Sequence, residues 1–423
     1  MMEKVFTPLS GSQGLSIIEL KNTIQQRDLY IWGAGLVGRG FKRVLERNGF
    51  TVKAFLDINP ALTTIDSIAV LRPENLIQNV RKGSAFIICT VGSQSKSIEQ
   101  QCLDAGLEKN KDFLSFLQVP RQQPVIEVGG VCNYFCSDCK EQKGKLENQH
   151  YMNAASYKNI LDKLCAENPL LLNIDLSLWR EPLCNPDIEE IIRFTNVRVL
   201  CKLISKLQNC AYLEDAVKAN PLQIQIIAEG YENTYEQNQI NGSAWKTFLA
   251  NLYKLREYAN KYKVDTEISM LYILYRNNNT IDLKKMKLLC NELGFKFITD
   301  TAYLTPYDNF LDVCEHRELS PQIQKFKELL TWNMEAVLKM CMENARRPCI
   351  CQRIFPVINY DGAVSLCHLF CKPKVTANFL DVPYSKIVEE RGKHKFCRQC
   401  QSYGLHRLDL EILKKYFPEK DMM

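Results

Sequence analysis

The stretch that decides the fold is residues 129–139, GGVCNYFCSDC, which directly follows the strand-like run Val125–Val128. It places Cys132, Cys136 and Cys139 in C-x3-C-x2-C spacing within one short loop. Three thiolates cannot complete a structural zinc site, because such a site takes four protein ligands. They can hold three corners of a cubane iron–sulfur cluster and leave its fourth iron open. The alternative, three core cysteines on one turn, is disfavoured because the turn is polar and begins with glycines.

Downstream of this loop, strand and helix patterns alternate. Apolar runs of strand length are separated by amphipathic stretches with the helical period. This alternation is typical of a parallel α/β barrel. The predicted strands are Asn173–Leu178, Leu222–Ile227, Thr266–Leu274 and Lys296–Leu304, and the predicted helices start near Pro186, cover Trp245–Ala259, and cover Ile281–Leu293 with Gly294 as the cap.

Residues 119–319 resemble the radical S-adenosylmethionine (SAM) superfamily, in which a C-x3-C-x2-C loop follows the first strand of a partial (β/α)6 barrel. The resemblance implies that Cys132, Cys136 and Cys139 hold a [4Fe–4S] cluster and that SAM chelates its open iron. It also implies that an electron from the reduced cluster cleaves SAM to a 5′-deoxyadenosyl radical, with flavodoxin or ferredoxin as the reducing partner. The cofactor supplies the difficult chemistry, and the protein positions the target C–H bond.

Two acidic residues are the predicted SAM contacts. The family carries a Gly-Gly-Glu-Pro segment whose Glu holds the SAM ammonium; Glu181-Pro182 match it, while Trp179 and Arg180 replace the glycines. An acid facing an ammonium forms a charge-assisted bond, so Glu181 is the predicted ammonium ligand. Glu229 follows a predicted strand, where many relatives place an Asp near the SAM ribose. The alternative for Glu181 is an acid that flanks the start of a helix.

The C-terminal block, 320–423, is predicted to begin with one helix from Ser320 to about Ala345 and to continue with a hairpin at Asp361-Gly362. Cysteines gather around this hairpin, and four thiolates are enough for a fully ligated cluster or for a zinc site. The predicted ligands are Cys351, Cys367, Cys397 and Cys400, with Cys349 as a competitor for the first position and Cys371 as an alternative ligand or a bystander. The arrangement resembles the twitch form of the SPASM extension of radical SAM enzymes, which implies an auxiliary [4Fe–4S] cluster. The five histidines form no ligand pair and are predicted to lie at the surface or behind the ligands.

The N-terminal block, 1–118, carries a glycine-rich turn in a Rossmann-like context. A predicted strand ends at Trp32, a helix follows the turn, and a second strand ends in Asp57. Gly33, Gly35 and Gly38 would let the backbone approach a phosphate, and Asp57 would meet a ribose. The block resembles the small N-terminal domain of bacterial sugar O-acyltransferases and some sugar methyltransferases, which implies a nucleotide or nucleotide-sugar ligand. The alternative is a structural glycine turn without a ligand.

Composition excludes several classes of protein. The 423 residues include 24% charged side chains and 18 cysteines, with a net charge of +6. The apolar content is that of a folded protein rather than a disordered one. No dense basic block or long apolar run is present, so we predict neither a nucleic-acid partner nor a membrane span. The N-terminus lacks the apolar core of a signal peptide, which predicts a cytoplasmic location.

Taken together, the sequence predicts an α/β enzyme with a Rossmann-like domain, a partial barrel and an auxiliary-cluster hairpin. The predicted reaction is the oxidation or rearrangement of a sugar- or cyclitol-like small molecule, free or nucleotide-linked. One alternative is a maturase that modifies a ribosomal peptide or protein. A second alternative is a non-catalytic iron–sulfur protein that keeps its clusters for structure or redox sensing.

Overall fold

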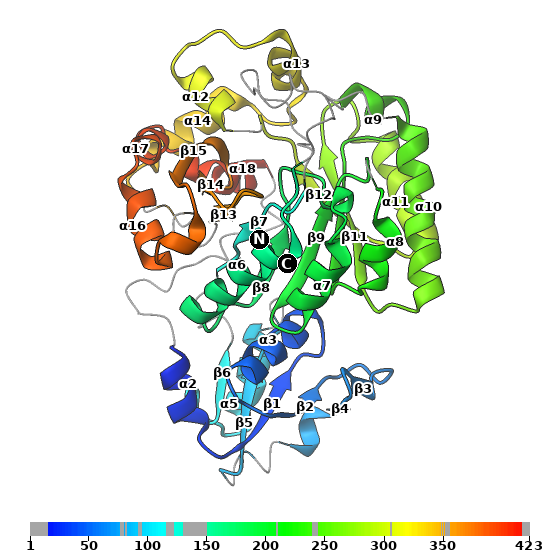
Figure 1. Ribbon diagram of the computed structural model, residues 1–423, viewed down its shortest axis with the longest axis vertical. Coiled ribbons are helices and arrows are strands. Elements are labelled where there is room, and N and C mark those ends of the chain that lie inside the picture. Colours follow the sequence, from blue (N-terminus) through cyan, green and yellow to red (C-terminus); the bar gives the residue numbers. More distant parts are fainter. Residues whose placement is uncertain are drawn as a thin grey trace.

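The computed structural model describes residues 16–76, 80, 83–91, 95–115, 122–129, 150–208, 210–238, 244–304, 307–347, 349, 351 and 356–416. Within these ranges the strands form one sheet of six strands and one of nine (Figure 1). Cys132, Cys136 and Cys139 lie outside the described residues, as does most of the loop that carries them. None of the described helices combines the length and the apolar character that crossing a membrane requires.

The N-terminal sheet has the order β3-β4-β2-β1-β5-β6 and is parallel except for the β3–β4 hairpin. The strands predicted in this block are confirmed, and so is the helix after the glycine turn. Strands β1 and β5 are buried over nearly their whole length and read as apolar runs, whereas the residues of β4 alternate between half-buried and exposed. The elements are α2 Ile17–Ile24, β1 Asp28–Trp32, α3 Leu36–Arg47, β2 Val52–Leu56, β3 Thr64–Ile65, β4 Ile68–Leu71, η1 Pro73–Asn75, β5 Ala85–Cys89, α5 Ser95–Asp104 and β6 Phe113–Ser115.

The second sheet has the order β12-β11-β10-β9-β8-β7-β13-β14-β15. Strands β7 to β12 are parallel and adjacent in chain order, which confirms the predicted (β/α)6 arrangement. The sheet is open, because β7 pairs with β13 rather than with β12. Its elements are β7 Val125–Ile126, α6 Ala154–Glu167, β8 Asn173–Leu176, η4 Pro182–Cys184, α7 Ile188–Asn196, β9 Leu200–Ser205, α8 Leu213–Lys218, β10 Gln223–Ala228, α9 Asn233–Asn238, α10 Trp245–Tyr262, β11 Glu267–Leu274, α11 Ile281–Leu293 and β12 Lys296–Thr301.

The C-terminal segment continues this sheet. The hairpin predicted at Asp361-Gly362 is confirmed: β13 and β14 pair antiparallel, and Gly362 takes a φ of +81°, which favours glycine. Helices cover the hairpin on the side away from α10 (Figure 1). The elements are α12 Asp308–Cys314, α13 Pro321–Leu329, α14 Met334–Glu343, β13 Val357–Ile358, β14 Val364–Cys367, β15 Phe370–Thr376, η5 Phe379–Asp381, α16 Tyr384–Lys393, α17 Lys395–Ser402, η6 Leu405–Arg407 and α18 Leu408–Tyr416.

The single helix predicted from Ser320 to about Ala345 is wrong, because the structure divides it into α13 and α14. Ser320 does cap the first helix, as predicted. The chain then turns inward, and the buried Trp332 donates its indole N–H to the carbonyl oxygen of Ala302. Asn333 starts the second helix by accepting the Ala336 amide. A tertiary contact therefore interrupts a sequence that has helical character on both sides.

The N-terminal sheet is joined to the barrel through α3. The Arg47 guanidinium donates to the carbonyl oxygens of Pro169, Leu171 and Arg198. Earlier on the same helix, a Cβ at Gly40 would lie 3.1 Å from the Cβ of Leu200, so the helix approaches closely. Leu200 begins β9, which places the N-terminal block at the amino ends of the barrel strands (Figure 1). The carboxyl ends of the same strands lie on the opposite side.

Candidate functional site

The predicted SAM contacts gather at the carboxyl ends of the barrel strands. Glu127 follows β7, Glu181 follows β8, Ser205 ends β9 and Glu229 follows β10. In parallel α/β proteins this edge is where ligands and catalytic groups are placed, because successive loops meet there. The geometry brings Glu181 and Glu229 to one side of the sheet, while their predicted contacts with SAM stay predictions.

Glu181 is fully buried and held by the end of β9. Its carboxylate accepts a hydrogen bond from the Ser205 hydroxyl at 2.7 Å and from the Lys206 amide at 3.1 Å. It also accepts from the Leu183 amide at 3.3 Å, which makes it the cap of η4. The alternative of a helix-flanking acid therefore describes part of its role. Burial of a carboxylate inside a set of donors keeps the group at one fixed position.

Lys206 brings a positive charge between the two predicted acids. Its backbone N–H bonds Glu181, and its ammonium lies 3.2 Å from the Glu229 carboxylate. The side chains of Lys206 and Glu229 are 7% and 13% exposed. The Glu229 carbonyl oxygen accepts from the amides of Asn238 and Asn278, which fixes the loop after β10. The sequence prediction missed Lys206, because nothing in a lone lysine distinguishes it from surface lysines.

Glu127 organises the segment that precedes Glu181. It is buried, and its two carboxylate oxygens accept the backbone N–H groups of Leu178 at 2.9 Å, Trp179 at 2.8 Å and Arg180 at 3.1 Å. Burial raises the pKa of Glu127, while the bonds from Trp179 and Leu178 act in the opposite direction. The prediction missed this residue, although an acid inside the apolar strand pattern of β7 was a usable signal.

Gly129 permits a close crossing between the first two loops. A Cβ on this residue would lie 2.1 Å from the carbonyl oxygen of Glu181 and 2.5 Å from its carbonyl carbon. No side chain can occupy that space, so the first glycine of the 129–139 stretch is required by packing. The crossing fixes the start of the cysteine loop against the backbone of Glu181.

Trp179 and Arg180, the two residues before Glu181, contact the C-terminal hairpin. Trp179 packs with Val125 and with Val357 of β13 in one small apolar cluster. The Arg180 guanidinium lies 4.4 Å from the centroid of the Tyr360 ring, a cation–π distance. The two residues therefore dock the C-terminal segment onto the barrel next to Glu181.

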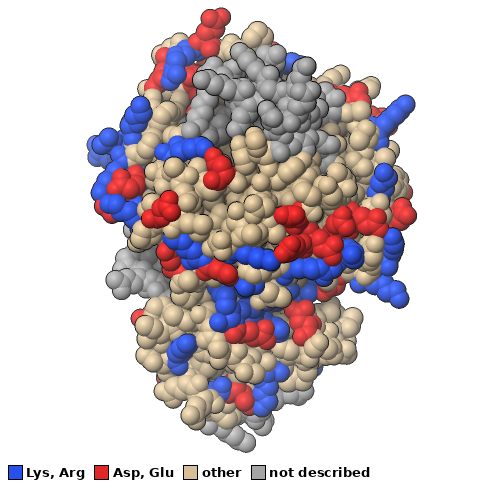
Figure 2. Space-filling model, viewed as in Figure 1, with Lys and Arg blue, Asp and Glu red and all other residues tan. Residues whose placement is uncertain are grey.

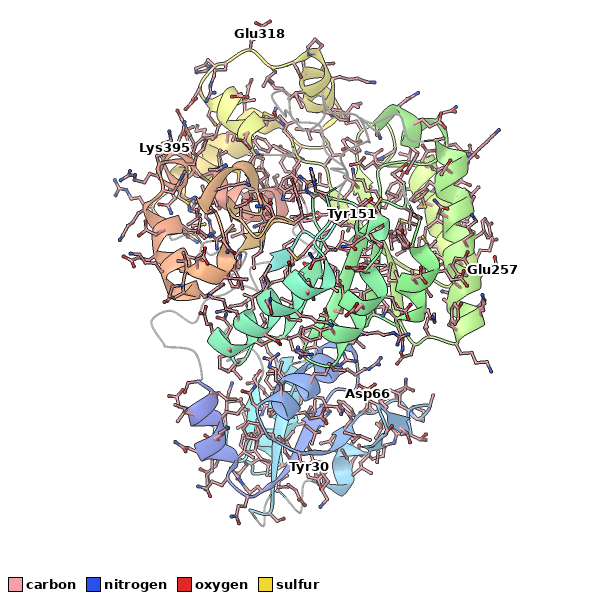
Figure 3. The ribbon with its side chains drawn as sticks, in the orientation of Figure 1. Tyr30, Asp66, Tyr151, Glu257, Glu318 and Lys395 are labelled. Carbon is pink, nitrogen blue, oxygen red and sulfur yellow. The ribbon has the colours of Figure 1, made fainter. Side chains whose placement is uncertain are left out.

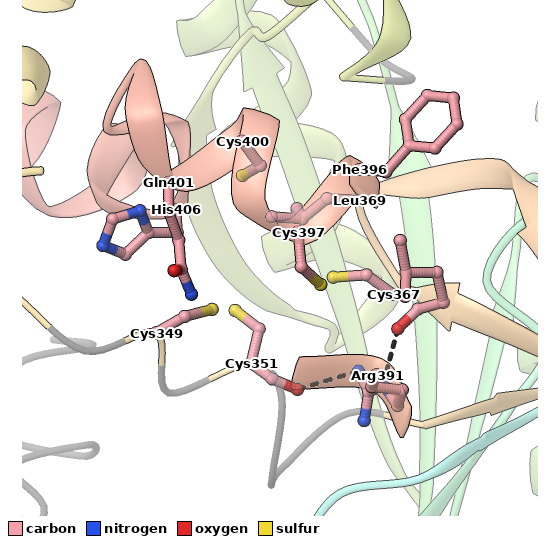
Figure 4. Close-up of a pocket in the computed structure, with 11 residues that line it drawn as sticks. Cys349, Cys351, Cys367, Leu369, Arg391, Phe396, Cys397, Cys400, Gln401 and His406 are labelled. Carbon is pink, nitrogen blue, oxygen red and sulfur yellow. Dashed lines mark hydrogen bonds between the residues drawn. The ribbon is translucent and has the colours of Figure 1, made fainter. Parts of the chain in front are cut away.

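All four predicted auxiliary ligands line one cavity, together with the competitor Cys349 (Figure 4). Cys367 ends β14, and Cys397 and Cys400 lie one turn apart on α17. The thiols of Cys349 and Cys351 both point into the space between them and α17 (Figure 4). The backbone of Cys371 belongs to β15, and its side chain lies outside the described atoms.

Two basic residues, Arg391 and His368, contact the segments that carry the cavity's cysteines. The Arg391 guanidinium is fully buried and donates to the carbonyl oxygens of Cys351 and Leu366. The Sγ atoms of Cys351 and Cys367 and a ring nitrogen of His368 all lie within 4.8 Å of one another. His368 Nδ1 is 3.7 Å from Cys367 Sγ. The hydrogen bond from Cys351, together with His368, holds the pKa of Cys367 well below its usual value.

The donor set of this cavity fits a thiolate-ligated metal centre. The remaining lining is apolar or neutral except for Arg391 and His406, and no carboxylate borders it among the described residues. Converging thiols without carboxylates suit an iron–sulfur cluster or zinc rather than a hard cation. The sequence predicted that the histidines form no pair of metal ligands and lie at the surface or behind the ligands. In the structure His368 contacts the thiol of Cys367, which is a predicted ligand.

In the glycine turn of the N-terminal block, some positions require glycine and another has free space for a side chain. Gly33 takes a φ of +113°, and a Cβ on Gly38 would lie 1.8 Å from the Gly33 carbonyl oxygen, so both are required by the turn. A Cβ on Gly35 would meet nothing within 4 Å, and its φ of −76° is open to any residue. The Asp57 carboxylate accepts the amides of Ala34 at 3.0 Å and Asn59 at 2.9 Å, so it also supports the turn.

Comparisons with known proteins give a result only for solved structures, since no family model and no curated protein matches the chain. The structure is similar to a histidine-tagged form of anSMEcpe with bound AdoMet, with a TM-score of 0.43, 15% sequence identity, and coverage of 71% of this chain and 94% of that one. It is similar to SuiB from Streptococcus suis bound to S-adenosylmethionine, with a TM-score of 0.42, 15% identity, and coverage of 71% and 75%. It is also similar to BtrN in complex with AdoMet and 2-DOIA, with a TM-score of 0.36, 12% identity, and coverage of 70% and 92%.

Proposed function

We propose that the chain is a radical SAM enzyme with one auxiliary [4Fe–4S] cluster, acting by oxidation or rearrangement on a sugar- or cyclitol-like small molecule. The observation that carries the proposal is the convergence of Cys351, Cys367, Cys397 and Cys400 on one cavity. The hairpin that bears Cys367 extends the same sheet whose first strand leads into the C-x3-C-x2-C loop. A three-cysteine loop after the first strand and four cysteines beside the appended hairpin would provide the ligands for two separate clusters.

Cluster and SAM, when bound, would supply the radical chemistry that activates a C–H bond of the substrate. Cys132, Cys136 and Cys139 would hold that cluster, and Gly129 seats the start of their loop on the Glu181 backbone. The chain's own residues therefore determine where the cofactor lies.

Glu181 would receive the SAM ammonium, and Glu229 would face the ribose. Both carboxylates are held in place from behind, by Ser205 and the Lys206 amide for Glu181 and by the Lys206 ammonium for Glu229. Glu127 holds the backbone that enters Glu181, so the acid cannot move with the loop. A pre-positioned carboxylate recognises an ammonium without a further ordering cost.

The auxiliary cavity would hold the second cluster. Its cysteines come from three segments, and Arg391 ties two of them together through the Cys351 and Leu366 carbonyl oxygens. A cluster at this position would accept one electron from the substrate radical, which is thereby oxidised. An acidic carrier such as flavodoxin or ferredoxin would exchange electrons with the enzyme. The glycine turn is proposed to bind a nucleotide or nucleotide-sugar at the open position beside Gly35.

Anaerobic reconstitution followed by iron, sulfide and zinc analysis tests the cluster assignment. Two cubanes predict about eight irons and eight sulfides per chain. Replacing Cys132, Cys136 and Cys139 with Ala should halve this content and abolish the production of 5′-deoxyadenosine from SAM. The matched control replaces three half-buried cysteines outside both groups and should keep the full content; these are Cys165, Cys210 and Cys314. Stoichiometric zinc in place of half the iron would refute the auxiliary cluster.

Calorimetry with UDP-sugars, ADP and NAD tests the glycine turn. The Gly35→Asp variant should lose binding, because the new carboxylate occupies the open position and repels a phosphate. Asp57→Ala should lose less, because it adds no negative charge at the phosphate position, although it removes one ribose contact and the acceptor of the Ala34 amide. If the wild-type chain binds none of these ligands at millimolar concentration, the turn is structural, and the sugar assignment loses the support of this domain.

A further inference from the structure

Helices α16 and α17 concentrate positive charge beside the auxiliary cavity. Together they carry five basic and only two acidic side chains, which is half of the net charge of +6 that the whole chain has. Figure 2 shows Lys and Arg side chains along the edge of the molecule that these helices occupy in Figure 1. The residues are Lys386, Arg391, Lys393, Lys395 and Arg398, with Glu389 and Glu390 as the acids.

The charges on α17 remain uncompensated. On α16, Lys386 and Lys393 form ion pairs with Glu389 and Glu390. Lys395 is exposed and lies at the outer edge of the molecule (Figure 3), and Arg398 is exposed as well. Neither forms an ion pair with any carboxylate in the described part of the chain. These two cations are therefore available to a partner.

The auxiliary cavity approaches solvent at this helix and at Cys349, whose side chain is also half-buried. Cys351, Cys367 and Cys400 are 8%, 8% and 6% exposed, whereas Cys397 and its neighbour Phe396 are only half-buried and still line the cavity. Lys395 and Arg398 flank this pair in sequence. An aromatic residue with a cation on each side in sequence, next to a half-buried thiol of the cavity, has the layout of a small protein-docking site with a charged rim.

We propose that Lys395, Phe396, Cys397 and Arg398, the α17 patch, dock an acidic electron-transfer protein that exchanges one electron with the auxiliary cluster. The proposal rests on the proposed function, because it requires a cluster in this cavity. One electron leaves the reduced cluster and reduces the oxidised carrier, a flavin or iron–sulfur protein, and the reverse step oxidises the carrier. Opposite charge steers such encounters and raises their rate at low salt. Two exposed cations, of which Lys395 lies 5.8 Å from the centroid of the Phe396 ring, are too few to follow a nucleic-acid backbone.

Charge reversal with a matched control tests the patch. The test variant is Lys395→Glu/Arg398→Glu, and the control is Lys246→Glu/Lys254→Glu on the exposed face of α10, on the other side of the barrel. Both change the net charge equally. The full-length reconstituted chain is mixed with the hydroquinone form of an acidic bacterial flavodoxin. Stopped-flow absorbance then follows cluster reduction, and calorimetry measures the affinity of oxidised flavodoxin, each at low and high salt.

The test variant should lose about tenfold in affinity and in the rate of reduction at low salt, with the difference disappearing at high salt. Reduction by dithionite, which needs no docking, should be unchanged, and the control should stay within about twofold of wild type. Equal rates for the test and control variants would overturn the α17 patch. The proposal would also fail if the test variant lost binding to a nucleic acid or to an anionic vesicle and still bound flavodoxin as wild type does. Iron analysis of the wild type separates this outcome from failure of the proposed function, which would appear as a missing second cluster.

Discussion

Gly129 offers the sharpest test of how the cysteine loop is seated. In Gly129→Ala the new Cβ would lie 2.1 Å from the Glu181 carbonyl oxygen and 2.5 Å from the carbonyl carbon. Ordinary contacts need more than about 3 Å, so one backbone must move by about 1 Å. Both neighbours are backbone atoms, and Glu127 holds the strand that enters Glu181, so the shift cannot be absorbed by a side chain. We expect a loss of about 2–4 kcal/mol of stability.

The assay combines thermal unfolding with iron analysis. The displaced residue opens the loop that leads to Cys132, so the SAM-cluster half of the iron should be lost as well. Gly35→Ala is the matched control, since its Cβ meets nothing within 4 Å and its φ is −76°. We expect that variant to change stability by less than about 1 kcal/mol. A Gly129→Ala chain with wild-type unfolding temperature and full iron content would refute the reasoning.

Three further predictions follow from buried groups around the two sites. Glu181→Gln should weaken SAM binding by roughly tenfold with both clusters assembled, measured by calorimetry; unchanged affinity would show that another group holds the ammonium. His368→Leu should lower the reduction potential of the auxiliary cluster by about 40–90 mV, the equivalent of about 1–2 kcal/mol for one electron, because the reduced cluster loses the donor beside Cys367. A redox titration measures this potential, and His368→Gln should restore part of the lost potential. Because the pKa of Glu127 is raised in the folded state, its contribution to stability is fully present below the ordinary pKa of about 4.3 and is lost as the pH rises through the folded-state pKa. Between these two pKa values the stability of wild type relative to Glu127→Gln should therefore fall with rising pH. A stability difference that does not change with pH would contradict this prediction.

Much of the fold could be predicted because the strands are buried on both faces. In β5, for example, all five residues of Ala85–Cys89 are buried, so the strand reads as one apolar run. Strand β9 was missed because Lys202 interrupts the run in Leu200–Ser205, and pairing with β8 and β10 decides its conformation. The break between α13 and α14 was missed for a similar reason, since the Trp332 contact with Ala302 belongs to the tertiary structure.

In the candidate sites, too, features that depend on nearby residues could be predicted, and features that depend on long-range contacts could not. The C-terminal group of thiols could be predicted in part because some ligand spacing is local, as with Cys397 and Cys400 on one helical turn. The supporting residues could not, because each acts across a long separation in sequence. Glu127 bonds amides more than fifty residues away, and the Lys206 amide reaches Glu181 from the next strand. Residue types that are common everywhere acquire a role only when the sheet brings these loops together.

The position of the N-terminal block also limits what its glycine turn can do. The turn belongs to a sheet that α3 attaches to the amino ends of the barrel strands, through Arg47 and the Gly40 contact with Leu200. The radical chemistry that we propose takes place at the carboxyl ends, beyond the six residues of β9, a length of roughly 20 Å. A ligand bound at Gly35 therefore cannot present its own C–H bond to a radical beside Glu181 while it stays in place. If the block binds a nucleotide-sugar, it acts as an anchor or a sensor, and the substrate's ring must be recognised by the loops after β7 to β12.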